Sequence, residues 1–392
     1  MTRTVIAATQ EIDARLQVPE LIRLALRGLS DMFDEDRRLF CFRMVSDEKG
    51  MVREGISHRY TLISLLGLHQ AQLAGHQSPV DIRLTIQELL RDTNWITNIG
   101  DLGLLVWLCA EAMPERLLGI DAIFDLKRAL VHFGESRRRR TMELAWFLTG
   151  LAHQNLKCPE ELPHLRSVAV EAYELLTSNQ GERGTFSHLA ETGGWAGLMR
   201  GRFGSFADQI YPIYALSKFS QAYQQPKAAE RALACAQTLC ELQGPSGQWW
   251  WHYDAPTGKV LGCYPVYSVH QHGMAPMGLI AIGDATQIDF SPWIFKGLRW
   301  ICGENELEYD MRSTSANVVW RSIYRTDYLR HCDTALALLV SCKDSRTHNN
   351  LAILRECWPY ELGWLLYSWA NPALQMTSQP HVPAKSAAEL RQ

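Results

Sequence analysis

Apolar and polar positions alternate along most of the chain with the period of an α-helix, and the helical segments come in pairs. Residues 18–33 carry charge on one side and Leu, Ile and Phe on the other, which is typical of a helix with one exposed face. The partner segment, 57–74, has far fewer charges, as expected of a helix that other helices surround. The same pattern predicts further outer and inner partners at 81–92 with 101–112, 121–134 with 141–153, 164–178 with 207–222, 226–243 with 270–282, and 291–302 with 360–370.

Such hairpins cannot bury an apolar face alone, so they must stack on one another. The outer and inner partners can close into a ring, and we therefore predict an all-α fold, an (α/α)6 toroid. The alternative is an open superhelix of helix pairs. Long inserts at 179–206, 244–269 and 303–359 favour the ring because they can cover one of its ends.

We expect short β-hairpins in these inserts, with strands limited to 244–269 and 303–325. The toroid is predicted to form one domain over residues 1–371. The remaining tail, 372–392, is rich in Pro, Ser and Ala, so we expect it to be disordered.

A short motif follows two of the predicted outer helices, first as Gln180-Gly-x-x-Gly184-x-Phe186 and then as Gln243-Gly-x-x-Gly247-x-Trp249. The glutamine can cap carbonyls at the helix end, the glycines permit a left-handed turn, and the aromatic side chain covers the join. The second copy resembles the QW motif of the terpenoid cyclase and protein prenyltransferase toroids, and similar turns occur in six-hairpin sugar-active enzymes. In the cyclase and prenyltransferase families the motif ties the helices of the barrel together, so the resemblance implies the toroid.

Composition narrows the functional classes. The hydrophobic content of 47% and charged content of 21% are typical of a globular chain with a sizeable core. A net charge of −3 provides no basic surface for nucleic acid. No apolar run approaches the length of a membrane span, and the apolar core of the N-terminal segment is too short for a signal peptide. The ten cysteines include no C-x-x-C pair, which argues against a disulfide framework and leads us to expect a cytoplasmic protein.

The stretch 243–277 is the richest in chemistry, with three consecutive tryptophans followed by imidazoles and a carboxylate. Such a density of aromatic and titratable groups is typical of a concave site, although it could also form a hydrophobic plug at one end of the ring. The candidates in this stretch are Trp250, Trp251, Tyr253, Asp254, His270 and His272.

The predicted inner helices begin near one end of the ring, so their first polar side chains should point at a shared space. These are Arg59, Tyr60, Glu143, Asp208, Gln209, Tyr211 and Glu361, and the third insert adds Arg321. Some of them, such as Asp208, also suit a helix cap. Together they suit a polyhydroxylated or anionic ligand, because carboxylates bind hydroxyls and move protons while arginine pairs with an acidic group.

Two other interpretations of these residues are a metal site and the proton-donating site of a lipid cyclase. His270 and His272 face apart on a helix, and neither an H-E-x-x-H pattern nor a cysteine ligand set is present, so we expect no metal and no cofactor. Lipid-cyclising toroids use an acid in a D-x-D-D-T-A stretch. The nearest match, Arg330-His-Cys-Asp333-Thr-Ala335, replaces two of its acids with Arg and Cys.

The leading interpretation is a carbohydrate-active enzyme with a glycan or small-molecule substrate, whose reaction could be hydrolysis, elimination or epimerisation. The acid/base candidates are Asp208, Glu143 and Asp254, with His270 and His272 as relays or hydroxyl ligands. Arg59 and Arg321 would hold an acidic substituent, and the aromatic side chains would stack on sugars. The alternatives are an isoprenoid cyclase that keeps only Asp333, and a non-catalytic glycan-binding protein of a polysaccharide assembly pathway.

Overall fold

A computed structural model describes residues 14–48, 50–133, 140–160, 162–189, 202–326 and 350–370. Helices dominate these ranges. Their bounds are α2 Val18–Met32, α3 His58–Leu73, α4 Ile82–Arg91, α5 Ile99–Ala112, η1 Pro114–Arg116, α6 Leu117–Phe124, α7 Ala129–His132, α8 Thr141–Lys157, α9 Leu165–Thr177, α11 Phe206–Tyr223, α12 Pro226–Glu241, η2 His270–Met274, α13 Ala275–Thr286, α14 Ser291–Ile301 and α16 Pro359–Trp369.

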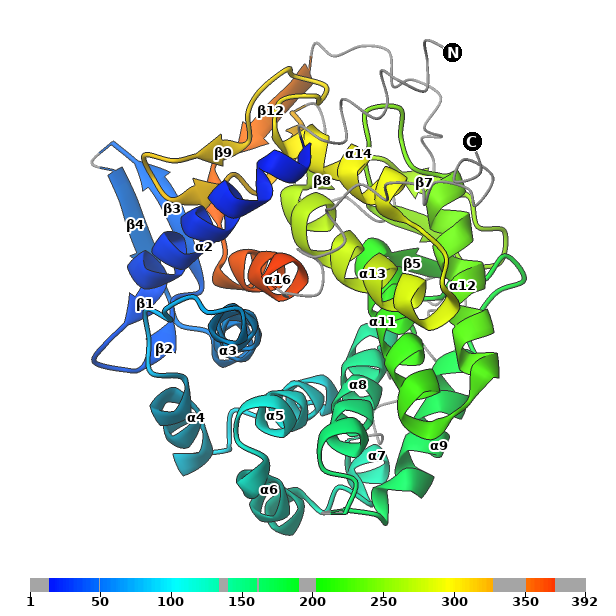
Figure 1. Ribbon diagram of the computed structural model, residues 1–392. Helices are drawn as coiled ribbons and strands as arrows, with labels where there is room; N and C mark the ends of the chain where they lie inside the picture. Colours follow the sequence, from blue (N-terminus) through cyan, green and yellow to red (C-terminus); the bar gives the residue numbers. More distant parts are fainter. Residues whose placement is uncertain are drawn as a thin grey trace, which may run out of the picture.

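The helices form two concentric rings (Figure 1). Within the described ranges, the inner ring runs through α3, α5, α8, α11, α13 with its η2 start, and α16, which packs back on α3. The outer layer consists of α2, α4, α6, α9, α12 and α14. Helix α5 shows why the inner members are so apolar: from Ile99 to Ala110 every side chain is buried, because other helices contact it all round. Both the predicted helix pairs and the predicted ring are confirmed.

The third outer helix differs from the prediction, because 121–134 is not one continuous helix. Helix α6 ends where Asp125 adopts a left-handed conformation with φ 46°, and a new short helix, α7, begins at Ala129. The side chain of Asp121 accepts a hydrogen bond from the backbone N–H of Leu126, which stabilises this break. Helical periodicity continues across the break, so the sequence pattern alone does not reveal it.

The ring closes through a close approach of α3 and α16. A Cβ atom added at Gly67 would lie 2.1 Å from the carbonyl oxygen of Gly363, and one added at Gly363 would lie 2.8 Å from the carbonyl oxygen of Ile63. Glycine at these two positions therefore lets the first and last inner helices pack backbone against backbone.

The repeated glutamine motif forms the same joint in both copies. Gln180 donates its side-chain N–H groups to the carbonyls of Gly184 and Arg231, each at 2.9 Å. Gln243 donates to the carbonyls of Gly247 at 3.1 Å and Trp293 at 2.9 Å. Each glutamine thus fastens its own turn to the backbone of the next outer helix, α12 or α14. Gly184 and Gly247 have φ of 83° and 96°, which glycine adopts without strain.

Small antiparallel sheets join the inserts. The strands are β1 Phe33–Asp34, β2 Leu39–Phe40, β3 Arg43–Asp47, β4 Gly50–Glu54, β5 Phe203–Ser205, β6 His252–Asp254, β7 Val260–Gly262, β8 Val266–Tyr267, β9 Arg312–Ser313, β10 Val318–Val319, β11 Ser322–Arg325, β12 Leu351–Leu354 and β13 Glu356–Cys357. The sheets have the orders β1-β2, β10-β9, β12-β11-β8, β13-β3-β4 and β5-β6-β7. Strands are therefore not limited to 244–269 and 303–325. The β3–β4 hairpin was missed because one of its faces is largely exposed and carries little apolar alternation.

Two sequence predictions fall outside the described residues, namely the expected disorder of the tail 372–392 and the Asp333 stretch. Cys263 is disulfide-bonded, although the cysteine pattern argues against a disulfide framework. No helix in the described ranges is both long enough and apolar enough to cross a bilayer.

Candidate active site

First-turn side chains of the inner helices meet at one end of the ring, which we call the N-terminal face. Arg59 at the start of α3 pairs with Asp101 at the start of α5 through two bonds, of 2.6 and 3.1 Å. Asn98, the N-cap of α5, donates to the same carboxylate at 2.6 Å. The guanidinium of Arg59 lies 5.5 Å from the ring of Trp146. Arg59 therefore already has a carboxylate partner within the protein, and its binding of an acidic substituent stays a prediction.

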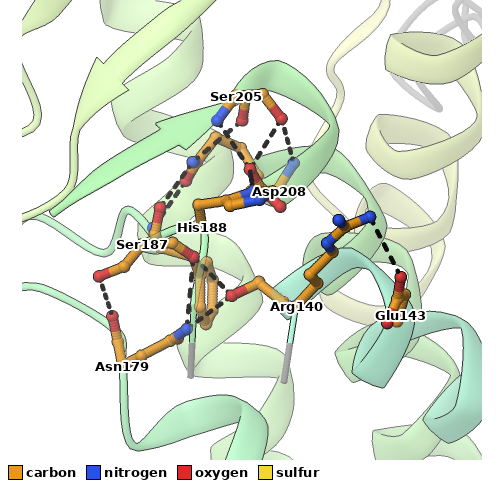
Figure 2. A network of polar contacts seen from close by, with 10 residues as sticks. Arg140, Glu143, Asn179, Ser187, His188, Ser205 and Asp208 are labelled. Carbon is orange, nitrogen blue, oxygen red and sulfur yellow. Dashed lines mark hydrogen bonds and ion pairs between the residues drawn. The ribbon is translucent and has the colours of Figure 1, made fainter. Parts of the chain in front are cut away.

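Glu143 lies next to this pair, in the first turn of α8. Burial raises the pKa of its carboxyl, while the charges of Arg140 and Arg59 oppose the rise. The guanidinium of Arg140 lies 3.5 Å from the Glu143 carboxylate (Figure 2). A carboxyl group that keeps its proton to a higher pH than usual is suited to act as a general acid.

Asp208 is held at the start of α11 by a capping box. Ser205 is the N-cap, and Asp208 is the third helical residue rather than the cap itself. One carboxylate oxygen, Oδ2, accepts from the backbone N–H and the hydroxyl of Ser205, both at 2.8 Å, and from Nδ1 of His188 at 3.0 Å. The other, Oδ1, is buried with no hydrogen-bond partner in the described part of the chain.

The imidazole of His188 points from its loop toward Asp208 (Figure 2). The hydrogen bond to Asp208 raises the pKa of His188, with burial opposing it. The side chain of His188 is 39% exposed, whereas that of Asp208 is 1% exposed. Of the two, His188 is therefore the group that a ligand can reach, and Asp208 orients it and holds its charge.

His188 lies close to Glu143 because the loop that carries His188 pairs with the segment that leads into α8. The backbone N–H of Thr141 donates to the carbonyl of His188 at 3.0 Å, and Arg140 forms an antiparallel bridge with Leu189. Sequence reasoning missed His188. The 63-residue offset between the two glutamine motifs could have found it, because it places His188 in the position that Trp251 occupies in the second copy.

Aromatic and imidazole side chains continue the face beyond Asp208. Trp251 lies 4.5 Å from Tyr267 and 6.0 Å from His270, ring centre to ring centre, and is stacked on the latter. Burial lowers the pKa of His252 to about 4 and that of His270 to about 3, so both are neutral near pH 7. Helix η2, which begins at His270, is a π-helical segment, a feature that often occurs at functional sites.

A further group of aromatic side chains lies where α3 and α16 begin. Tyr60 contacts Trp358 and Tyr360 at centre distances of 5.5 and 4.8 Å. Arg321 lies 3.5 Å above the Trp358 ring and forms a buried ion pair with Glu361. Arg321 and Glu361 are thus partners of each other, and their binding of a substrate stays a prediction. Tyr60 stays a candidate for stacking against a ligand, and Trp358 joins it.

Tyr211 is buried below this face, where it accepts a hydrogen bond from the indole of Trp364 at 2.9 Å. Its ring meets Trp146 edge-on at 5.0 Å. It therefore supports the floor of the site between α8 and α16.

Burial and hydrogen bonds within the fold engage five further predicted site residues, so their roles toward a ligand stay predictions. Gln209 bonds both backbone groups of Phe186, at 2.7 and 2.8 Å, so it is a structural clamp. Asp254 is bound to Arg202 and Thr257 in a turn, Trp250 donates to the Leu242 carbonyl, and Tyr253 and His272 are 0% exposed.

The arrangement brings a carboxyl with a raised pKa, an imidazole paired with a buried carboxylate, and aromatic rings to one face. This set can donate a proton, stabilise negative charge and stack against an apolar ring face. Among the described residues, no three His, Cys, Asp or Glu side chains gather as metal ligands do.

Comparison with known proteins identifies the fold. No protein-family model and no curated protein matches the sequence. A possible member of the GH105 family from Salmonella enterica matches with a TM-score of 0.60 at 13% identity, covering 92% of this chain and 95% of that one. Unsaturated glucuronyl hydrolases from Streptococcus agalactiae and Bacillus sp. GL1 match with TM-scores of 0.56 and 0.57 at 13% and 14% identity. They cover 91% and 93% of this chain, and 91% and 97% of their own. This chain shares the (α/α)6 toroid fold with these structures.

Proposed function

We propose that this protein is a carbohydrate-active enzyme that hydrolyses an oligosaccharide carrying an acidic sugar. The observation that carries the proposal is the meeting of Glu143 with the His188–Asp208 pair at the N-terminal face. Glu143 would donate a proton to the substrate, since burial keeps its carboxyl protonated to a higher pH. His188, oriented by Asp208, would contact the reacting group or the attacking water.

The charges of the face support an acidic substrate. Arg59 is neutralised by Asp101, but Arg140 is exposed and its contact with Glu143, at 3.5 Å, is loose. His188 adds a second positive charge whenever its imidazole is protonated. A sugar carboxylate or sulfate could bind these two groups, while Trp251 and Tyr60 are placed to stack on sugar rings.

The solved structures support hydrolysis over elimination or epimerisation. The similar structures include unsaturated glucuronyl hydrolases, one of them a variant in complex with dGlcA-GalNAc6S. The two alternatives have less support. The one acid kept from the cyclase stretch, Asp333, lies outside the described residues, and a glycan-binding protein without turnover would not require a carboxyl with a raised pKa.

A matched panel of disaccharides tests the proposal. The purified protein would be incubated with unsaturated glucuronyl disaccharides, their saturated counterparts and neutral disaccharides, with products followed by mass spectrometry. The Glu143→Gln protein is the control for contaminating activity. Turnover of an acidic disaccharide by the wild type alone supports the proposal.

Two outcomes would overturn it. Thermal stabilisation by acidic disaccharides without any turnover would favour a glycan-binding protein. Stabilisation by prenyl diphosphates and by no sugar would favour the isoprenoid alternative. The cytoplasmic location stays a prediction, which fractionation of expressing cells would check.

A further inference from the structure

A second group of buried polar side chains lies at the opposite end of the ring, where the inner helices end. There the structure has a cavity of about 240 Å³, a size that suits a small ligand. Its lining comes from the C-terminal halves of the inner helices, and none of the candidate active-site residues takes part. The cavity is therefore separate from the N-terminal face.

One wall of the cavity is a chain of hydrogen-bonded polar groups. Nδ1 of His153 lies 2.7 Å from the carboxylate of Glu111, and Nε2 lies 3.0 Å from the hydroxyl of Tyr214. That hydroxyl lies 2.6 Å from the hydroxyl of Tyr367. The side chains of Glu111 and His153 are only 3% and 6% exposed. Removing such polar groups from water costs free energy, which their mutual hydrogen bonds offset.

The direction of this chain follows from its charges. Burial lowers the pKa of His153, so its imidazole is neutral and donates Nδ1–H to Glu111. Nε2 is then an acceptor, which makes Tyr214 its donor and Tyr367 the donor to Tyr214. The ammonium of Lys157, 3.2 Å from Glu111, completes the neutralisation of that carboxylate. Glu111 and His153 therefore satisfy each other, whereas Lys157, whose side chain is 49% exposed, keeps further N–H donors.

Lys218 of α11 differs from these groups. It lines the cavity, and its ammonium lies 5.6 Å from the ring centre of Tyr214. Among the described residues, no carboxylate lies within ion-pair distance of it. Asp284 also lines the cavity, but it is exposed at the rim, where water screens its charge. Burial lowers the pKa of the half-buried ammonium of Lys218, while the charges of Asp284 and Glu111 oppose this shift from beyond ion-pair distance.

Apolar side chains also line the cavity, namely Leu73, Leu156, Met277, Ile280 and Ala281, of which Leu73 and Leu156 are exposed. A sugar would leave several hydroxyls unpaired against these side chains, whereas an alkyl or aryl body would bury its apolar surface there.

We propose that this cavity binds a small organic anion of the monocarboxylate class, with its carboxylate on Lys218 and its apolar body against Leu73, Met277 and Ile280. The proposal does not depend on the function proposed for the N-terminal face. The negative ends of the inner helices would favour a cation instead, so the charge preference of the cavity is the decisive quantity.

The test compares three probes with the same carbon chain, namely hexanoate, hexanamide and hexylammonium, by calorimetry on the full-length protein. We expect hexanoate to bind about tenfold or more tightly than hexanamide, as a charge-assisted hydrogen bond requires, and hexylammonium to bind least. Lys218→Met should remove the preference for hexanoate. Lys227→Met, at an exposed position of α12, should keep it.

A second variant keeps the proposal testable if Lys218→Met does not fold. Ile280→Asp places a carboxylate in the cavity from a half-buried position and should weaken hexanoate binding about tenfold through repulsion. Equal affinity for hexanoate and hexanamide, tighter binding of hexylammonium, or no binding of any probe would overturn the proposal. So would unchanged hexanoate binding by folded Lys218→Met protein.

Discussion

Nδ1 of His188 lies 3.0 Å from Oδ2 of Asp208, which joins an accessible imidazole to a carboxylate that water does not reach. The same carboxylate caps α11 through Ser205. Asp208 therefore has a structural role and a role in positioning His188, and the two can be separated by mutation.

At a pH above the raised pKa of His188, Asp208→Asn should change stability little and activity strongly. Asn can still accept from Ser205, but it carries no charge to hold an imidazolium. We expect kcat/KM to fall by about 10²- to 10⁴-fold and the pKa of His188, followed by NMR titration, to fall toward its ordinary value. Ser205→Ala is the control, since it removes the cap, costs about 1 kcal/mol and leaves the charge in place. Full turnover by Asp208→Asn would remove the pair from the mechanism.

The pair also predicts a pH dependence of stability. Because its folded pKa is raised, His188 contributes stability that is fully present below its ordinary pKa of 6.5 and is lost as the pH rises through the raised value. Urea unfolding across this range should show the loss in the wild type. In Asp208→Asn the loss should be absent, and an unchanged profile would contradict the ion pair.

Glu143 should set the alkaline limb of the activity profile. If it donates a proton, activity falls as the pH rises through its pKa, which lies above the ordinary 4.5. Arg140→Gln removes a charge that lowers this pKa and should shift the limb to higher pH. Arg83→Gln removes a similar exposed ion pair elsewhere and should leave the profile in place. A limb that does not move with Arg140→Gln would argue against Glu143 as the acid.

The buried pair of Arg321 and Glu361 should contribute strongly to stability. Their side chains are 10% and 2% exposed, and the pKa of Glu361 is raised to about 7 by burial in spite of Arg321. Arg321→Met leaves an unpaired buried carboxyl and should cost about 3–5 kcal/mol. Since that carboxyl is neutral when protonated, the cost should be smaller below pH 4.5 than above about pH 7. The double variant Arg321→Met/Glu361→Leu should recover most of the loss, and a cost that does not depend on pH would contradict this account.

His272 should make the protein labile to acid. Its pKa is lowered to about 3 by burial, so the native state resists a proton that the unfolded chain accepts at about 6.5. Stability is therefore present above pH 6.5 and is lost as the pH falls toward 3. His272→Leu should unfold at a lower pH than the wild type, followed by circular dichroism. His132→Gln, at an exposed position of α7, should behave like the wild type.

The ring could be predicted from the sequence because outer and inner helices differ in how many faces they bury. The site could be predicted only in part. A helix start places Asp208 and Gln209 at the same end of the ring, but successive residues differ in direction by about 100°. Asp208 therefore binds the imidazole of His188, whereas Gln209 binds the backbone of Phe186. His188 lies between predicted helices, where periodicity gives no information.

The glutamine joints have a consequence for how such a chain can diverge. Gln180 and Gln243 bind backbone carbonyls of the following outer helix, and every residue type supplies a backbone carbonyl. The helix that receives the bond can thus exchange most of its side chains, provided that its backbone stays in reach; Arg231 of α12 is an exception, because its guanidinium donates to the side-chain oxygen of Gln180 at 3.0 Å. Each joint needs only the glutamine and its glycine turn to keep neighbouring hairpins at a fixed spacing. The sequences of two such rings can therefore diverge at most positions while the hairpins keep the same arrangement.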